Sequence, residues 1–219
     1  MCEPTTVETS GLDAPPPLKV LVGGMETAMD TRELASDLAQ DVDLHFERMV
    51  REYQDRLYGF ALRLTSRPED AEEAVQDAFV RAYRALKTYP SGRIRSMALR
   101  AWLYQITLNV VRNRFRRKRH PTEALDGAAA QSVADPADGP DARLEASRQR
   151  EDLASLVGKL PARYRTPLVL RYVEGLKLEE VSEILGQPLG TTKSNVHRAI
   201  NALREAITQS RRQMRWSHA

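Results

Sequence analysis

The 219-residue sequence is poor in cysteine and in long apolar runs, the features that mark disulfide-rich, metal-binding and membrane proteins. Its single cysteine, Cys2, excludes a disulfide scaffold and any cysteine-rich zinc or iron–sulfur site. No apolar run approaches the roughly 20 residues that a membrane-spanning helix needs. The early apolar stretch at residues 18–22 is too short for a signal-peptide core and follows no basic leader. We therefore expect a soluble cytoplasmic protein with no membrane insertion.

Signs of catalysis are equally scarce. No glycine-rich loop that would cradle a phosphate is present, and the histidines are scattered without metal-ligand spacing. The acidic stretch at residues 69–77 allows a metal site or a docking face for a basic partner, but the capped, solvent-facing turn of a helix fits it better. We expect no enzyme, no catalytic residue, no metal and no cofactor.

What the sequence does have is an uneven distribution of charge. The formal net charge is only +3. Residues 1–45 nevertheless carry nine acidic residues against two basic ones, residues 93–122 carry nine Lys or Arg and no acid, and residues 191–219 carry six basic residues against one acid. Two basic stretches in a nearly neutral chain favour a polyanionic partner, although a solvated face or a localisation signal would account for one such run alone.

Periodicity and composition divide the chain into five segments. Apolar residues at helical spacing predict helices in residues 42–119 and 150–210, and no stretch shows a convincing strand pattern. Residues 120–149 predict a flexible acidic linker, residues 1–41 a disordered tail, and residues 211–219 a basic tail. The expected fold is therefore all-α, with two small helical domains joined by a flexible acidic linker, the C-terminal one a helix-turn-helix.

The first domain is predicted to contain three long helices. A capping box at Ser66–Glu69 should open the second helix, and the segment Tyr89–Gly92 should break the pattern before the third. Trp102, near the start of the third helix, is either a core residue or a platform for an unstacked base. This helix then runs into the basic stretch that ends at residue 119.

The second domain ends in a helix-turn-helix pattern. Residues 178–185 form a short periodic segment, a glycine-bearing turn follows, and Thr191 opens a second periodic segment. Polar and basic side chains at the start of this second helix should face outward, where a recognition helix enters the major groove of DNA. Earlier in the domain, Pro167 removes a helix hydrogen bond and should cause a kink or an irregular turn.

Three stretches in this order resemble the extracytoplasmic-function sigma factors, the minimal two-domain members of the sigma-70 family. They are residues 68–86, residues 100–109 with the basic run after them, and residues 160–165 and 170–176 together with residues 190–199. Each alone is moderately specific, but the three in sequence across an acidic linker are highly specific. The resemblance implies a subunit that binds bacterial RNA polymerase core and directs promoter-specific transcription initiation.

The resemblance also implies three binding surfaces. For the melted minus-10 element the residues are Arg93, Arg95, Trp102, Asn109, Arg112, Asn113, Arg116 and Arg117. For the minus-35 duplex they are Arg171, Thr191, Lys193, Ser194, Asn195, His197 and Arg198. For polymerase docking they are Glu73, Gln76, Asp77 and Arg81. The implied partners are the beta-prime clamp and beta flap of RNA polymerase core, promoter DNA and an anti-sigma factor.

Two other interpretations stay open at this point. A stand-alone helix-turn-helix regulator would bind operator DNA without polymerase core, usually as a dimer, but no clear dimerisation helix is visible. An adaptor without promoter recognition would leave the basic run at residues 112–119 without a task. The sequence also departs from the family pattern in a longer stretch between Tyr89 and Trp102, and in Thr192 and Asn195, where the family commonly has Val and Arg.

Overall fold

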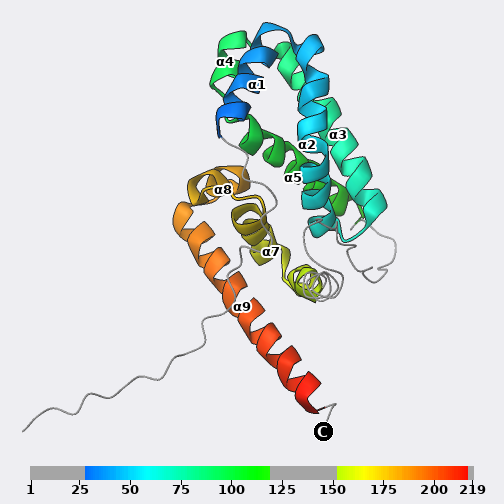
Figure 1. Cartoon of the computed structure of the whole chain (residues 1–219), viewed down its shortest axis with the longest axis vertical. Helices are drawn as coiled ribbons and strands as arrows, with labels where there is room; N and C mark the ends of the chain where they lie inside the picture. Colours follow the sequence, from blue (N-terminus) through cyan, green and yellow to red (C-terminus); the bar gives the residue numbers. More distant parts are fainter. Residues whose placement is uncertain (1–27, 119–151, 217–219) are drawn as a thin grey trace, which may run out of the picture.

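The computed structural model describes residues 28–118 and 152–216 (Figure 1). Over these residues the chain forms helices and connecting turns with no strand, so the expected all-α class is confirmed. The predicted linker and most of the predicted N-terminal tail lie outside the described residues. None of the helices in the described part combines the length and the apolar character needed to cross a membrane.

Within residues 28–118, the N-terminal half is built from five helices. They are α1 (Ala28–Gln40), α2 (Val42–Thr65), α3 (Pro68–Thr88), α4 (Ser91–Ser96) and α5 (Leu99–Lys118). The long helices α2 and α3 lie side by side and α5 packs against both (Figure 1). Their apolar stripes meet in a core whose largest fully buried side chains include Tyr53, Phe60, Leu86 and Tyr104.

Helix α1 corrects the predicted N-terminal boundary. Residues 28–40 belong to a helix and not to a disordered tail. Its buried apolar side chains are Leu34, Ala35 and Leu38. The side chain of Asp41 accepts hydrogen bonds from two backbone N–H groups in the first turn of α2, at 2.9 and 3.1 Å, and so allows a sharp turn between the helices. Burial of one apolar face against α2 and α4 outweighs the acidic composition that suggested disorder.

The turn between α2 and α3 also differs from the expected capping box. Ser66 closes α2 in the left-handed conformation, with φ 59° and ψ 15°, and its N–H donates to the Leu62 carbonyl at 2.8 Å. Arg67 is the residue before α3, and Pro68 occupies its first turn. Ser66 therefore ends one helix instead of starting the next, because a residue in the left-handed region cannot adopt the extended backbone of an N-cap.

The C-terminal half begins with helical residues 152–159. It continues with α7 (Ala162–Leu168), the π-helical turn η2 (Val169–Val173), α8 (Leu178–Leu185) and α9 (Leu189–Trp216). The irregularity expected at Pro167 is confirmed, since the helix widens into η2 just after this proline. Helix α9 extends to Trp216, beyond the predicted domain end at residue 210.

The two halves touch each other. In Figure 1 the C-terminal half lies below the N-terminal half, with α8 next to α5. Helix α7 also contacts α2, and a single cluster of buried apolar side chains includes residues from both halves. Helix α5 is therefore a structural part of the N-terminal half and also a support for the C-terminal half.

Candidate nucleic-acid interface

The first turns of α9 present a polar and basic surface. Five of the residues predicted for the minus-35 duplex have exposed side chains there: Thr191, Lys193, Ser194, His197 and Arg198. Asn195 is half-buried. The Asn201 side-chain nitrogen lies 3.1 Å from Nε2 of His197, one helical turn away, and orients the imidazole. These residues form the exposed start of a helix, the position from which recognition helices reach base edges.

Buried residues and a left-handed glycine set the orientation of this surface. Gly186 ends α8 with φ 63°, a conformation that suits glycine. On the opposite side of α9, Thr192 is buried, and its backbone N–H donates to the Pro188 carbonyl at 3.0 Å. Val181, Val196 and Leu203 are also buried. Helix α9 begins at Leu189, two residues before the predicted Thr191, so Thr191 lies inside its first turn.

Arg171 is placed differently from the other predicted minus-35 residues. It lies in η2 and is half-buried. Its Nη1 donates to the Leu176 carbonyl at 3.0 Å, and its guanidinium carbon is 5.9 Å from the centroid of the Tyr172 ring. The structure therefore gives Arg171 a bracing role in the segment that leads to α8, apart from any contact with DNA.

Helix α5 presents a second polar and basic surface. Asn109, Arg112 and Arg116 are exposed and recur at steps of three and four, so they share one face of the helix. Asn113 is half-buried beside them, and the side chain of Arg117 lies outside the described residues. Long cationic and amide side chains in one row suit the phosphates and bases of a single strand.

Aromatic rings cluster where α5 begins. The guanidinium carbon of Arg93 lies 3.8 Å from the centroid of the Tyr89 ring. The Tyr89 and Trp102 ring centroids are 6.1 Å apart at 56°. Trp102 is half-buried against the core, and Arg95 is exposed. The long segment between Tyr89 and Trp102 thus contains the short helix α4, and it places Arg93 and the Tyr89 ring beside Trp102 at the beginning of α5.

The predicted polymerase-docking residues share one face of α3. Glu73, Gln76 and Arg81 are exposed, and the Asp77 side chain is partly so. Arg114 of α5 reaches across to this face, forms an ion pair with Glu73, and lies 3.5 Å from the Asp77 carboxylate. Hydrogen bonding to Glu73 raises the pKa of the Arg114 guanidinium. Arg114 is therefore part of the α3 face, although it belongs to the basic run of α5.

Sequence reasoning missed two apolar residues on the same side of α3. Val80 and Tyr83 are 48% and 37% exposed, which is high for side chains of this size. The Tyr83 hydroxyl donates to Asp43 at 2.7 Å, and Lys87 lies 2.8 Å from the same carboxylate. The signal was present in the sequence, because Val80 lies four residues after Gln76 and Tyr83 lies seven after it.

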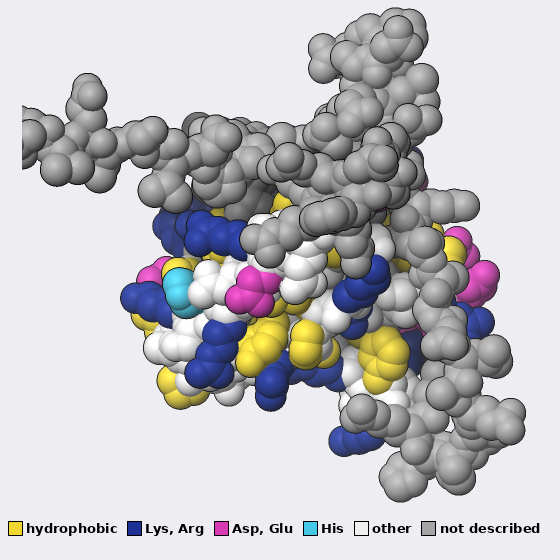
Figure 2. Space-filling view, turned by 90° about the horizontal axis from the view of Figure 1, so that it is seen from below, with side chains coloured by type: hydrophobic (Ala, Val, Ile, Leu, Met, Phe, Trp, Pro, Cys, Tyr) yellow, Lys and Arg dark blue, Asp and Glu magenta, His cyan; other side chains and the backbone are white. Residues whose placement is uncertain are grey.

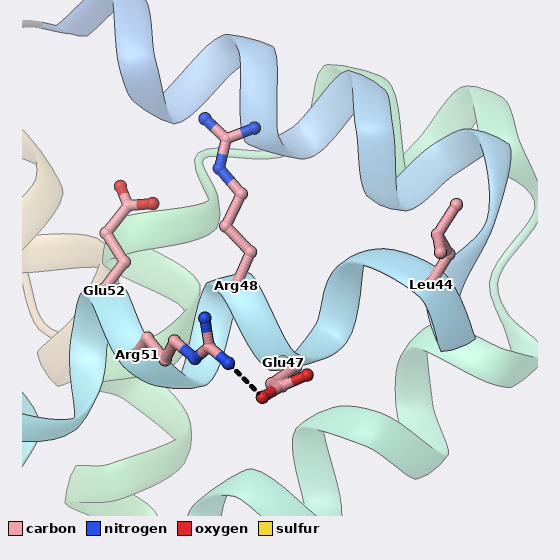
Figure 3. A pocket seen from close by; sticks show the side chains of 5 residues that line it. All are labelled: Leu44, Glu47, Arg48, Arg51 and Glu52. Atoms are coloured by element: carbon pink, nitrogen blue, oxygen red, sulfur yellow. Dashed lines mark hydrogen bonds and ion pairs between the residues drawn. The ribbon is translucent and has the colours of Figure 1, made fainter.

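A groove beside α2 was not predicted. It has a volume of about 460 Å³ and is lined by Leu44, Glu47, Arg48, Arg51 and Glu52 (Figure 3). Arg51 pairs with Glu47 at 2.5 Å, and Arg48 pairs with Asp37 of α1 at 2.8 Å. No group of three metal-ligating side chains gathers in the described part of the chain. The groove thus has charged walls whose arginines are already paired.

The underside of the molecule shows cations over a wide area. In Figure 2, Lys and Arg side chains are scattered across the described part of this face, with few acidic side chains between them. Such a surface attracts a polyanion over distances of about a Debye length, roughly 8–10 Å at physiological salt.

Comparisons with known proteins agree with this arrangement. The family model for sigma-70 region 2 matches residues 49–120, and the model for sigma-70 region 4 matches residues 150–203. The ECF RNA polymerase sigma factor SigW of Bacillus subtilis is 35% identical over 173 residues, which cover 74% of this chain and 88% of SigW. SigE of Mycolicibacterium smegmatis is 34% identical over 169 residues, which cover 75% of this chain and 62% of SigE, so the match spans less than two thirds of that relative. The chain belongs to the extracytoplasmic-function sigma factors of the sigma-70 family, and the predicted family is confirmed.

Solved structures show the same fold. CnrH, in a complex with the cytosolic domain of CnrY, superposes with a TM-score of 0.58 at 26% identity and covers 82% of this chain and 97% of CnrH. RpoE of Bartonella quintana, in a complex with the anti-sigma factor NepR, has a TM-score of 0.61 at 24% identity and covers 74% of this chain and 96% of RpoE.

Proposed function

We propose that this protein is a promoter-specificity subunit that binds RNA polymerase core and directs transcription initiation. The observation that carries the proposal is the presence of two separate polar and basic faces, on α5 and on α9, in the two halves of one sigma-family chain. A protein that reads two promoter elements needs two such faces. A stand-alone regulator needs only α9, and the family membership does not favour it.

The α9 face suits the minus-35 duplex. Lys193 and Arg198 project from the exposed start of a helix, and such side chains contact phosphates or the acceptor edge of guanine in the major groove. His197 and Ser194 add shorter polar contacts between them. The buried Thr192 anchors the helix and stays out of the readout.

The α5 face suits the minus-10 element as a melted strand. Asn109, Arg112 and Arg116 provide contacts along a backbone, while Tyr89 and Trp102 provide aromatic surface at the beginning of the helix. Base stacking on an aromatic side chain contributes about 1–3 kcal/mol per base, which offsets the few kcal/mol lost when a base leaves the duplex stack.

The α3 face suits polymerase docking. Glu73, Gln76, Asp77 and Arg81 surround the exposed Val80, and an apolar centre with a charged rim is typical of protein interfaces. We assign this face to the beta-prime clamp and the C-terminal half to the beta flap. CnrH was solved with the cytosolic domain of CnrY, and the sigma factor RpoE was solved with the anti-sigma factor NepR, which supports an anti-sigma partner here. The role is regulatory, not catalytic, and belongs to the cytoplasm, where polymerase meets DNA.

Run-off transcription tests the proposal. Purified bacterial core polymerase is incubated with a promoter library, with and without the protein. We expect initiation only with the protein, from templates that share one pair of elements. Absence of initiation, together with tight sequence-specific binding of duplex DNA by the protein alone, would establish the stand-alone regulator instead.

A further inference from the structure

The polar face of α9 continues one turn beyond the residues predicted for the minus-35 duplex. Asn201 lies seven residues after Ser194 and four after His197, on the same side of the helix. The opposite side carries a stripe of buried side chains at steps of three and four, which are Thr192, Val196, Ala199 and Leu203. Because this stripe fixes the rotation of α9, the half-buried Asn201 belongs to the face that points away from the core.

Four polar side chains on this face have the spacing with which a helix reads bases. They occupy positions i, i+3, i+4 and i+7 and are Ser194, His197, Arg198 and Asn201. Homeodomain recognition helices contact the major groove from positions with this spacing, and one of these contacts is made by an asparagine to adenine. Seven residues of α-helix span roughly 10.5 Å, or about three base pairs at ~3.4 Å each. Asn201 therefore reaches the stretch of groove that Ser194 enters.

His197 holds the side-chain amide of Asn201. Nδ2 of Asn201 lies 3.1 Å from Nε2 of the His197 ring. An amide nitrogen donates and does not accept, so Nε2 is the acceptor, and the neutral ring carries its hydrogen on Nδ1. Among the described residues, no hydrogen bond uses Oδ1 of Asn201 or the second N–H of its amide. One acceptor and one donor thus remain available, side by side, on a held group.

These two atoms match the major-groove edge of adenine. An amide binds adenine twice, because its oxygen accepts from the N6 amine while its N–H donates to N7. Guanine presents two acceptors at the same edge, and cytosine and thymine present one polar group each, so none of them uses both atoms of the amide. The hydrogen bond to His197 also limits rotation of the amide before DNA arrives, which reduces the entropy lost on binding.

We propose that Asn201 is a specificity-determining residue of the minus-35 surface, where it reads an adenine in the major groove with an amide held by His197. The proposal rests on the proposed function and deepens it, since it names the base that one position of the α9 face selects. The minus-35 residues that the family resemblance implies end at Arg198, so Asn201 adds one helical turn to the surface.

Transcription from a promoter library tests the assignment. Each base pair of the minus-35 element is varied in turn, with bacterial core polymerase and the full chain at limiting concentration. With the parent chain we expect one position at which adenine is preferred because of Asn201. Asn201→Ala should lower initiation from the adenine promoter by roughly 5- to 150-fold, the usual loss of a bidentate base contact, and should make the four bases equal at that position alone.

Two further variants separate base reading from a structural role. Asn201→Asp keeps the shape of the side chain but replaces its donor by an acceptor, so the preference should shift from adenine to cytosine, whose N4 amine donates. A residue that merely stabilised α9 would not change which base is preferred. Gln209→Ala removes an exposed amide eight residues further along the helix and should leave the rate and the preference unchanged. Circular dichroism should show the same helix content in all variants.

NMR on the free protein tests the hydrogen bond itself. At a pH of about 8.5, where an ordinary imidazole is neutral, the nitrogen shifts of the His197 ring report which nitrogen carries the hydrogen. We expect it on Nδ1 in the parent, and we expect Asn201→Ala to lose this preference. A hydrogen on Nε2 in the parent would mean that Oδ1 of Asn201 faces the ring. The amide would then turn donors toward the base, and the adenine contact would be refuted.

The outcomes separate this assignment from the proposed function. If the parent chain initiates at no promoter, the proposed function fails and the assignment fails with it. If the parent initiates and Asn201→Ala keeps the same base preference at every position, the assignment of Asn201 alone is wrong. A fall in rate that is equal for all four bases in Asn201→Ala and Asn201→Asp would likewise overturn base reading by Asn201.

Discussion

The two halves of the molecule use their cations in different ways. In the N-terminal half, ion pairs link separate helices: Arg114 joins α5 to α3, Lys87 joins α3 to α2, and Arg48 joins α2 to α1. In the C-terminal half, Lys193 and Arg198 project from α9 and take part in none of the ion pairs found among the described residues. Charge in the first half therefore holds its helices together, while Lys193 and Arg198 on α9 remain available for a partner.

The largest change in stability should come from a substitution in the core of the N-terminal half. Leu57→Ala removes a fully buried side chain from α2 and should lower the free energy of unfolding by about 2–5 kcal/mol. Chemical denaturation gives the total loss, and hydrogen exchange shows which half loses protection. We expect exchange to rise in α2 and α3 and much less in α9. An equal rise in exchange in both halves would show that they unfold as one unit, so that their stabilities could not be compared separately.

A smaller change is expected for a substitution on α9, and it should affect DNA binding and not the stability of the fold. Arg198→Ala should weaken promoter binding by the polymerase complex by about 1–3 kcal/mol and leave the unfolding midpoint unchanged, because the side chain is exposed. Arg204→Ala is the matched control, since Arg204 is exposed on the same helix six residues further on and is turned by about 120° around the helix axis. Similar losses for both variants would mean that α9 contributes only general charge.

For Arg114 of the N-terminal half we expect the reverse: a loss of stability with little change in DNA binding. Arg114→Ala breaks the pairs with Glu73 and Asp77 and should lower the free energy of unfolding by at most about 1 kcal/mol, because the acids are well exposed and solvent screens the charges. Its effect on the salt dependence of DNA binding should be small. A clear drop in the salt slope would instead place Arg114 on the DNA face and remove the contrast between the halves.

The smallest expected change is in the pKa of Asp43, at the contact between α2 and α3. Hydrogen bonds from Lys87 and Tyr83 hold the pKa of Asp43 below its ordinary value of 3.8. A lowered carboxyl pKa contributes stability that is present above the ordinary value and is lost as the pH falls through the lowered one. Carboxyl titration by NMR should show Asp43 below 3.8, and Lys87→Met should move it upward. Arg84→Met, an exposed change on the same helix, should leave it unchanged.

Local patterns in the sequence predicted much of the fold. The apolar spacing located α2, α3, α5 and the helix-turn-helix, because a helix that packs on one side must repeat every three or four residues. Helix α1 was not predicted, although Leu34, Ala35 and Leu38 have the same helical spacing. The acidic residues and the nearby glycines and prolines favoured a disordered tail instead. The capping box at Ser66 failed because one residue can end a helix as readily as begin the next.

Contacts between distant residues were beyond prediction from the sequence. The pairing of Arg114 with Glu73 spans 41 residues, and that of Tyr104 with Glu174 spans 70. Nothing in the local pattern distinguishes Arg114 from its basic neighbours, or Glu174 from an exposed acid in a loop. Such pairs depend on how completed helices pack, so only the folded chain reveals which charges remain available to partners.

Site-specific crosslinking is the most direct test of the claim that the two halves read different forms of DNA. A photoreactive side chain replaces Ser194 on α9 or Asn109 on α5, both exposed, in complexes with core polymerase and a promoter. We expect the α9 probe to crosslink the upstream element as duplex, before and after melting. The α5 probe should crosslink the downstream element only after melting. Crosslinks from both probes to one element, or equal crosslinking of the α5 probe to unmelted DNA, would contradict the account.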